Sequence, residues 1–237
     1  MVSQADHNTT LPVIQYPLYG ESKRSIIHQQ EDVLIVHEHL NQAATPSRLY
    51  RPADNCFCFV IKGEVHLQSE QQAVNLKPHQ AVWLPTQQSS VLTLLTPNVI
   101  LCTIQFTKVT LANQPQTLQK ISTGTVDSKL EKKHIQVWPL WEGNTARICI
   151  EKYPAHYSET LYYQKAASHY LLPLKGSAYL ARRNAAAIPC TQFGQFIPAR
   201  EASAIINPEE DHLILLTVII SKQQKLKGRV IVLNRPD

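Results

Sequence analysis

Two pairs of residues in this chain are of metal-binding types and stand two positions apart in segments that read as strands. His37 and His39 flank Glu38, and Cys56 and Cys58 flank Phe57. Because successive residues of a strand face opposite sides, each pair presents its two side chains on one face. Imidazole and thiolate pairs of this kind could contribute to a zinc-type site. The alternatives, which we favour, are an outward-facing or rim pair of histidines and a pair of thiols buried in the core.

Composition and charge exclude several classes of protein. Hydrophobic residues make up 43% and charged residues 17% of the chain, as in a globular protein with a core. The net charge is +5, but the basic residues are scattered, so we expect no nucleic-acid partner. No apolar run is long enough to span a bilayer and the first residues do not resemble a signal peptide, so we expect no membrane partner. The five cysteines form no framework, which favours a reduced, cytoplasmic protein.

The elements that would position these residues are short strands. Their segments are rich in β-branched and aromatic residues and are separated by Pro, Gly, Asn and Asp. They cover residues 33–40, 56–61, 81–84, 99–106, 147–153, 169–172 and 212–220. This pattern predicts an all-β protein, a sandwich or a barrel. A polar linker is expected over residues 107–133, with a helical turn at 128–133.

The same pattern of strands and turns occurs twice. Residues 35–106 align with residues 148–219 without a gap, and apolar positions match through most of that length. The alignment superposes the Lys62-Gly63 turn on Lys175-Gly176, Pro85 on Pro198 and Ser90 on Ser203. We therefore predict two domains, at residues 1–115 and 116–237, joined by a linker around residues 107–130.

Each half resembles the cupin superfamily, and the two together resemble a tandem bicupin. The resemblance covers about 70 residues of each half and rests on the Gly and Pro turns and the strands around them. It implies two jelly-roll barrels, each with a mouth that could hold a ligand. In the family, two His, a Glu and a later His converge inside the barrel on a divalent metal.

In the first half, none of the motif's four ligand positions holds the His or Glu that the family has there. With Gly63 as the motif glycine, Cys56 occupies the Glu position and Ser90 the later His position. The His-x-His positions fall on Tyr50 and Pro52, or on Leu49 and Arg51 with the longer spacing.

In the second half, the resemblance places His169 at the Glu position and Ser203 at the later His position, and keeps Asn207 as the motif asparagine. The His-x-His positions fall on Tyr163 and Lys165, or on Tyr162 and Gln164 with the longer spacing.

These replacements predict a bicupin without a metal or another cofactor, whose second barrel binds a small molecule. We predict a ligand site formed by Tyr163, Lys165, His169 and Ser203, polar and partly cationic, for an anionic or sugar-like metabolite. The alternative is a metal-dependent cupin enzyme, an oxygenase or isomerase. Its off-pattern site would join His156 and Glu159 to His169.

Two aromatic segments precede the repeats at similar places, at residues 16–19 and 138–141. They could form a lip on which a ligand stacks. We favour packing, either between the barrels or between the subunits of a homodimer. No glycine-rich phosphate loop or dinucleotide fingerprint is present in the sequence.

Overall fold

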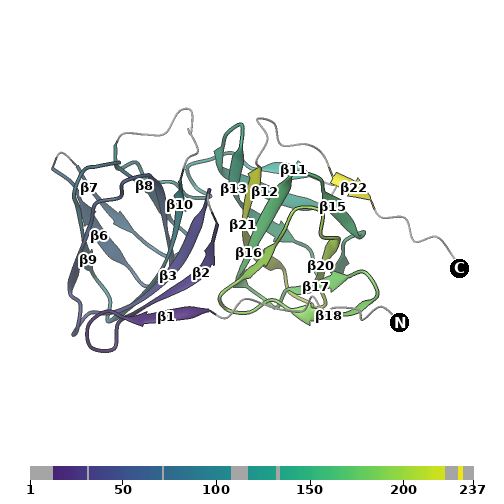
Figure 1. The fold of residues 1–237 in the computed structure, drawn as a ribbon, viewed down its shortest axis with the longest axis horizontal. Helices are drawn as coiled ribbons and strands as arrows, with labels where there is room; N and C mark the ends of the chain where they lie inside the picture. Colours follow the sequence, from purple (N-terminus) through teal and green to yellow (C-terminus); the bar gives the residue numbers. More distant parts are fainter. Residues whose placement is uncertain are drawn as a thin grey trace, which may run out of the picture.

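All regular secondary structure that the structure describes is β-strand, which confirms the all-β prediction (Figure 1). The computed structural model describes residues 13–30, 32–70, 72–107, 117–131, 134–221 and 229–231 of the chain. The strands predicted at 33–40, 56–61, 99–106 and 147–153 each match an observed strand to within one residue at either end. Over the described residues, no helix is long and apolar enough to cross a membrane.

The first half of the chain forms a barrel from two antiparallel sheets. One sheet contains β1 (Ile14–Pro17), β2 (Lys23–Gln29), β3 (Leu34–Asn41), β5 (Asn55–Lys62), β8 (Ala81–Leu84) and β10 (Asn98–Phe106). The other contains β4 (Ser47–Tyr50), β6 (Val65–Gln68), β7 (Ala73–Leu76) and β9 (Ser90–Leu94). The strand orders are β1-β2-β3-β10-β5-β8 and β4-β9-β6-β7, so the connections cross repeatedly between the sheets, as in a jelly roll.

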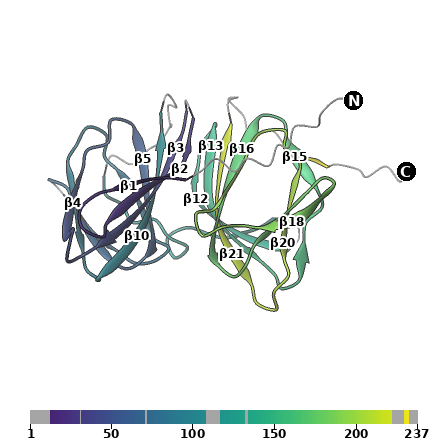
Figure 2. The same cartoon turned by 60° about the horizontal axis from the view of Figure 1, so that its bottom comes forward.

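The second half forms a barrel in the same way. Its first sheet contains β11 (Lys129–Glu131), β12 (Ile135–Glu142), β13 (Ala146–Tyr153), β16 (Ala167–Lys175), β19 (Gln195–Ile197) and β21 (Leu213–Ser221). Its second sheet contains β14 (Tyr157–Ser158), β15 (Tyr162–Gln164), β17 (Tyr179–Arg182), β18 (Ala185–Pro189), β20 (Ser203–Asn207) and β22 (Arg229–Ile231). The orders β12-β13-β21-β16-β19 and β18-β17-β20-β15 repeat those of the first barrel, and Figure 2 shows the two barrels beside each other.

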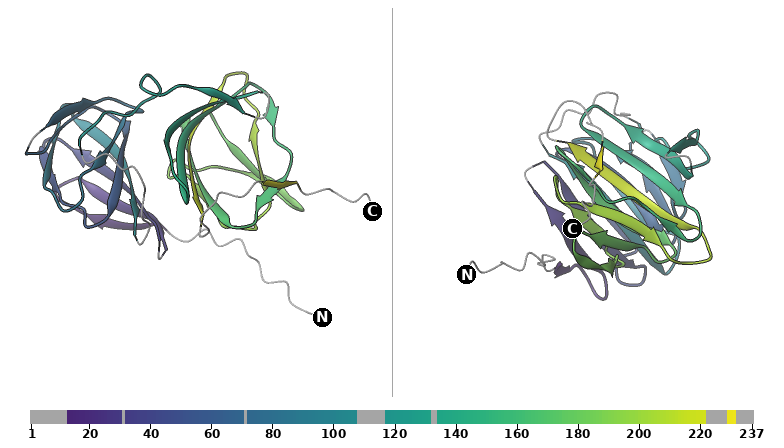
Figure 3. Two further views of the ribbon diagram at one scale, coloured as in Figure 1. Left: turned by 90° about the horizontal axis from the view of Figure 1, so that it is seen from above. Right: turned by 90° about the vertical axis from the view of Figure 1, so that its right-hand side faces the viewer.

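Each barrel has its own apolar interior, and a third core lies between the barrels. Alternation along β5 sends Cys56 and Cys58 into the first barrel and turns Phe57 and Phe59 outward. The outward side chains join residues of the second barrel, such as Leu216, in one buried cluster. The six-stranded sheets of the two barrels therefore face each other across a shared core (Figure 3).

The tryptophans of the chain belong to this shared core. Trp83 and Trp141 are buried in it, and Trp138 is partly buried against it. The rings of Trp83 and Trp141 pack edge to face with centroids 5.5 Å apart, which joins the two barrels directly. The aromatic segment at residues 138–141 thus packs between the barrels. In the corresponding segment of the first half, Tyr16 and Tyr19 are exposed.

The segment between the barrels differs from the sequence prediction. Residues 108–116, which contain the predicted domain boundary, lie outside the described residues. Leu118 and Ile121 pack against the first barrel, and Ile121 forms a β-bridge with Ala81. The helical turn predicted at 128–133 is wrong, because residues 129–131 form β11 and pair with β12 at the edge of the sheet. An unpaired sheet edge offers backbone hydrogen bonds that a single polar turn of helix cannot match.

Candidate functional site

The interior of the first barrel contains a buried carboxylate held by two arginines and a tyrosine. Glu38 on β3 is 1% exposed. Arg24 donates from Nε and Nη2 to Glu38 Oε1 at 2.9 and 2.7 Å, and Arg48 Nη2 lies 3.1 Å from the same oxygen. The Tyr50 hydroxyl donates to Glu38 Oε2. We call these four residues the first-barrel cluster, and its cations and phenol compensate the buried carboxylate.

The strand register explains how the first-barrel cluster forms. Arg24 on β2 lies directly opposite Glu38 on β3, so their side chains share the inner face of the sheet. Tyr50 comes from the other sheet, where it pairs with Ser90. The cluster thus links the two sheets of the barrel, and the Tyr50 hydroxyl has its partner within the chain.

The second barrel contains a small cavity between its two sheets. The cavity has a volume of about 10 Å³, which is room for about one water molecule. Its walls come from β15, β16, β19 and the turn that leads into β20. The lining residues are Tyr162, Tyr163, Gln164, Ala167, His169, Ile197, Pro198, Glu201 and Ser203.

Three buried polar atoms of the lining lack a hydrogen bond among the described residues; Glu201 Oε1 forms an ion pair with Arg182 at 3.2 Å, and the other two have no polar partner. These two are Gln164 Oε1 and His169 Nε2, and both side chains belong to the lining. Burial lowers the pKa of His169 to about 4, so its imidazole is neutral near physiological pH. A buried polar atom without a partner costs about 1–3 kcal/mol of stability, so two of them at one cavity indicate a position for a polar guest.

The structure brings together three of the four predicted ligand residues. Tyr163, His169 and Ser203 line the cavity, but Lys165 is exposed and does not. The placement of Lys165 in the cavity is therefore corrected. Gln164, which belongs to the alternative spacing, takes the inward position together with Tyr162.

A one-residue difference between the barrels causes this change. Tyr50 pairs with Ser90 in the first barrel, and Tyr162, not Tyr163, pairs with Ser203 in the second. The connection from Tyr162 to His169 is thus one residue longer than the connection from Tyr50 to Cys56. Because side chains alternate along a strand, a shift of one residue exchanges the inward and outward faces.

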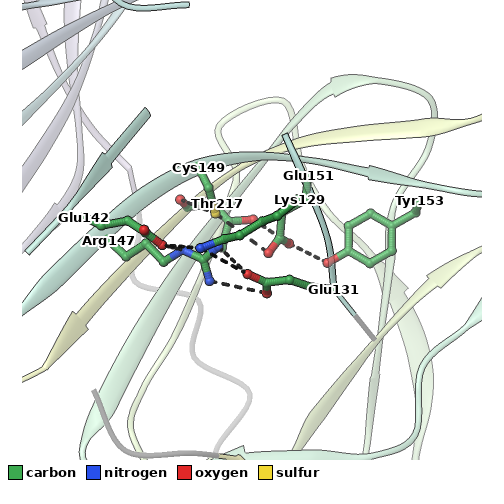
Figure 4. A network of polar contacts seen from close by, with 8 residues as sticks. All are labelled: Lys129, Glu131, Glu142, Arg147, Cys149, Glu151, Tyr153 and Thr217. Carbon is green, nitrogen blue, oxygen red and sulfur yellow. Dashed lines mark hydrogen bonds and ion pairs between the residues drawn. The ribbon is translucent and has the colours of Figure 1, made fainter. Parts of the chain in front are cut away.

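A second buried carboxylate, Glu151 on β13, lies in the second barrel and is 3% exposed (Figure 4). Tyr153 and Thr217 donate hydroxyl hydrogen bonds to Glu151 Oε2 at 2.5 and 3.0 Å. Its nearest direct partners are hydroxyls, and burial raises the pKa of Glu151. Arg147, on the same strand, instead forms an ion pair with Glu131 at 2.6 Å. Glu151 therefore resembles a satisfied interior carboxyl group, and it does not line the cavity around His169.

Sequence reasoning missed both interior carboxylates. Glu38 and Glu151 occupy the same position in the alignment of the two halves, and each is buried. An identical acidic residue at one position of two apolar strands was the signal that could have revealed them, because a buried acid requires a partner.

The two histidines of β3 share a face, which is the face that meets the second barrel. His37 is buried there, with Nε2 2.9 Å from the Tyr170 hydroxyl, and His39 is half-buried beside Phe193. The Tyr170 hydroxyl donates to the Phe193 carbonyl, so it accepts a hydrogen bond from the N–H of His37. Burial, and secondarily His39, lower the pKa of His37 to about 3.

Comparison with known proteins supplies the fold but no activity. No protein-family model and no curated protein sequence matches this chain. Among solved structures, AerE from Microcystis aeruginosa is similar with a TM-score of 0.70 at 13% identity, over 89% of this chain and 97% of that one. Oxalate decarboxylase from Bacillus subtilis is similar with a TM-score of 0.65 at 8% identity, over 96% and 80%. A cupin 2 conserved barrel domain protein from Leptotrichia buccalis is similar with a TM-score of 0.65 at 11% identity, over 87% and 92%.

The fold is that of the cupins. The resemblance implies that the metal ligands of a cupin would lie at Tyr50, Pro52, Cys56 and Ser90 in one barrel and, with the longer spacing, at Tyr162, Gln164, His169 and Ser203 in the other. Burial raises the pKa of Cys56 well above its usual value, so this thiol is protonated and a poor ligand. In neither barrel does this donor set fit a divalent metal.

The off-pattern metal site is not assembled either. His156 is exposed, at a backbone φ of 52°, and its Nδ1 lies 3.2 Å from the Pro208 carbonyl. Glu159 accepts a hydrogen bond from the backbone N–H of Ile205 at 3.2 Å. Within the described ranges, no three His, Cys, Asp or Glu side chains gather as a metal site requires.

Proposed function

We propose that this bicupin is a binding protein whose second barrel holds a small, uncharged, hydroxyl-bearing molecule without a metal. The observation that carries the proposal is the pair of buried, unpartnered atoms at one cavity, Gln164 Oε1 and His169 Nε2. A hydroxyl group can donate to the amide oxygen and can donate to or accept from the imidazole. One guest hydroxyl, or the water that precedes it, would satisfy both atoms.

The remaining lining favours a neutral ligand over an anionic one. Ser203 adds a hydroxyl and the inward-facing Tyr162 adds a phenol, and both groups bind neutral oxygen groups well. Glu201 brings a carboxylate that pairs with Arg182 at 3.2 Å, so the cavity offers no excess positive charge. The anionic ligand predicted from the sequence depended on Lys165, and the exposed position of that residue removes its main support.

The cavity must open to admit more than one water molecule. The wall formed by β15 is the part best suited to move, because β15 has three residues and its ladder with β20 has a single pair, Tyr162 with Ser203. β15 also pairs over three residues with β22, the edge strand, so the two strands can shift together while only the single pair with β20 opens, and such weakly paired segments open first. We therefore place the entrance at β15, which carries Tyr163 and Gln164.

The test is a thermal-shift screen of sugars and polyols against the wild type and two neighbouring variants. A true ligand at about 100 times its Kd should stabilise the wild type by about 2.7 kcal/mol. Gln164→Met should abolish that stabilisation and should leave the ligand-free protein at least as stable, because it removes an unpartnered buried oxygen. Lys165→Gln, one residue away and exposed, should behave like the wild type.

Two results would count against the proposal. One is a ligand effect that survives in Gln164→Met, which would place the ligand elsewhere. The other is a molar equivalent of iron, manganese, nickel or zinc in protein purified without chelator, lost in His169→Ala. That result would favour the metal-dependent enzyme instead.

A further inference from the structure

A second, larger concavity lies on the outside of the second barrel. It is a groove with a volume of about 390 Å³, bordered by β11, β12, the end of β13 and the residue that precedes β21. This volume lies within the range of about 300–1,000 Å³ that is usual for small-molecule sites. The groove shares no residue with the cavity around His169.

Cross-strand register builds the floor of the groove. Leu130 lies opposite Gln136, and Gln136 lies opposite Lys152, so three neighbouring strands present an apolar side chain, an amide and an ammonium in one row. His212 directly precedes β21, whose first residue pairs with Tyr153, so its imidazole reaches the groove beside Lys152. His134, just before β12, contributes a second imidazole.

The lining is basic, and none of its described residues is acidic. It includes two lysines and two histidines. Lys129 is already neutralised, since its Nζ lies 2.8 Å from Glu142 and 3.7 Å from Glu131. Lys152 differs, because among the described residues no carboxylate lies within ion-pair distance of its ammonium. It is half-buried, which strengthens its attraction for an anion over that of a fully solvated lysine.

We infer that this groove binds a small organic anion, a phosphate ester or a carboxylate, with Lys152 as its charge partner. The Gln136 amide, whose Nε2 donates one hydrogen bond to Ser128 Oγ at 3.1 Å, has a second N–H to offer. Together with the imidazoles of His134 and His212, it can donate hydrogen bonds to the anionic oxygens. Leu130, 67% exposed on the edge strand, can cover the apolar part of such a molecule. The inference does not depend on the ligand proposed for the interior cavity.

Calorimetric titration of the full chain at low ionic strength tests this site with two probes, pyrophosphate and citrate. We expect saturable binding of at least one probe with one site per chain, and the preferred probe tells phosphate from carboxylate recognition. Lys152→Gln should weaken binding about tenfold or more, the usual effect of losing a charged hydrogen-bond donor. Lys165→Gln, which removes an equal charge outside the groove, should leave the affinity unchanged, and so should Gln164→Met.

Three results would overturn the inference: no binding of either probe, equal affinity in Lys152→Gln and wild type, or equal weakening by Lys152→Gln and Lys165→Gln. The last would indicate only non-specific attraction to a basic protein. The melting temperature of Lys152→Gln, measured without probe, separates lost affinity from lost folding.

Discussion

At the residue scale, the two interior glutamates occupy equivalent positions, but only Glu38 is in direct contact with arginines. Glu38 faces two guanidinium groups and a phenol, whereas Glu151 accepts hydrogen bonds from Tyr153 and Thr217. Replacing Glu38 by Gln leaves Arg24 and Arg48 beside a neutral amide, and we expect a loss of about 3 kcal/mol of unfolding free energy. Replacing Glu151 by Gln keeps an acceptor for both hydroxyls and should cost less than about 1 kcal/mol. Denaturant unfolding measures the loss of unfolding free energy in the two variants. Equal losses would show that the ion pairs of Glu38 with Arg24 and Arg48 add nothing to the stability.

At the element scale, the Lys-Gly turns are identical in sequence but differ in their surroundings. Gly63 and Gly176 have φ angles of 82° and 81°, so each alanine variant should lose about 1 kcal/mol from backbone strain alone. A Cβ at Gly63 would lie 2.5 Å from the Asn98 carbonyl oxygen, whereas at Gly176 the nearest atom is 3.4 Å away. We expect Gly63→Ala to lose about 3 kcal/mol and Gly176→Ala about 1 kcal/mol. Chemical denaturation of both variants decides this, and a larger loss for Gly176→Ala would contradict the described packing of the first turn.

At the scale of the whole molecule, the two barrels share one buried core besides the interior that each has of its own. We expect the shared core around Trp83 and Trp141 to couple the unfolding of the two barrels. We expect one calorimetric transition for the wild type. Trp141→Ala should cost about 3–5 kcal/mol and should separate the transition into two. Leu67→Ala, a comparable deletion inside the first barrel, should lower the stability without separating the barrels.

The sequence by itself indicated seven of the strands and the two Lys-Gly turns. These features depend on local chemistry: β-branched runs favour extended backbone, and Gly63 and Gly176 permit the positive φ of a tight turn. The strand order itself is seen only in the structure, where both halves have it. The preference for buried thiols at Cys56 and Cys58 also came from local alternation, and both are buried.

Only the tertiary structure decided which side chains face the cavity and which face the solvent. A connection one residue longer in the second half turned Tyr162 and Gln164 inward and Lys165 outward, and the local pattern of residues 162–165 suits either face. The basic groove depends on Leu130, Lys152 and His212, which strand pairing brings together from separate segments. The periodicity of one strand predicts which of its residues share a face. The register between strands decides which side chains of different strands lie side by side, and a binding site needs several of these together.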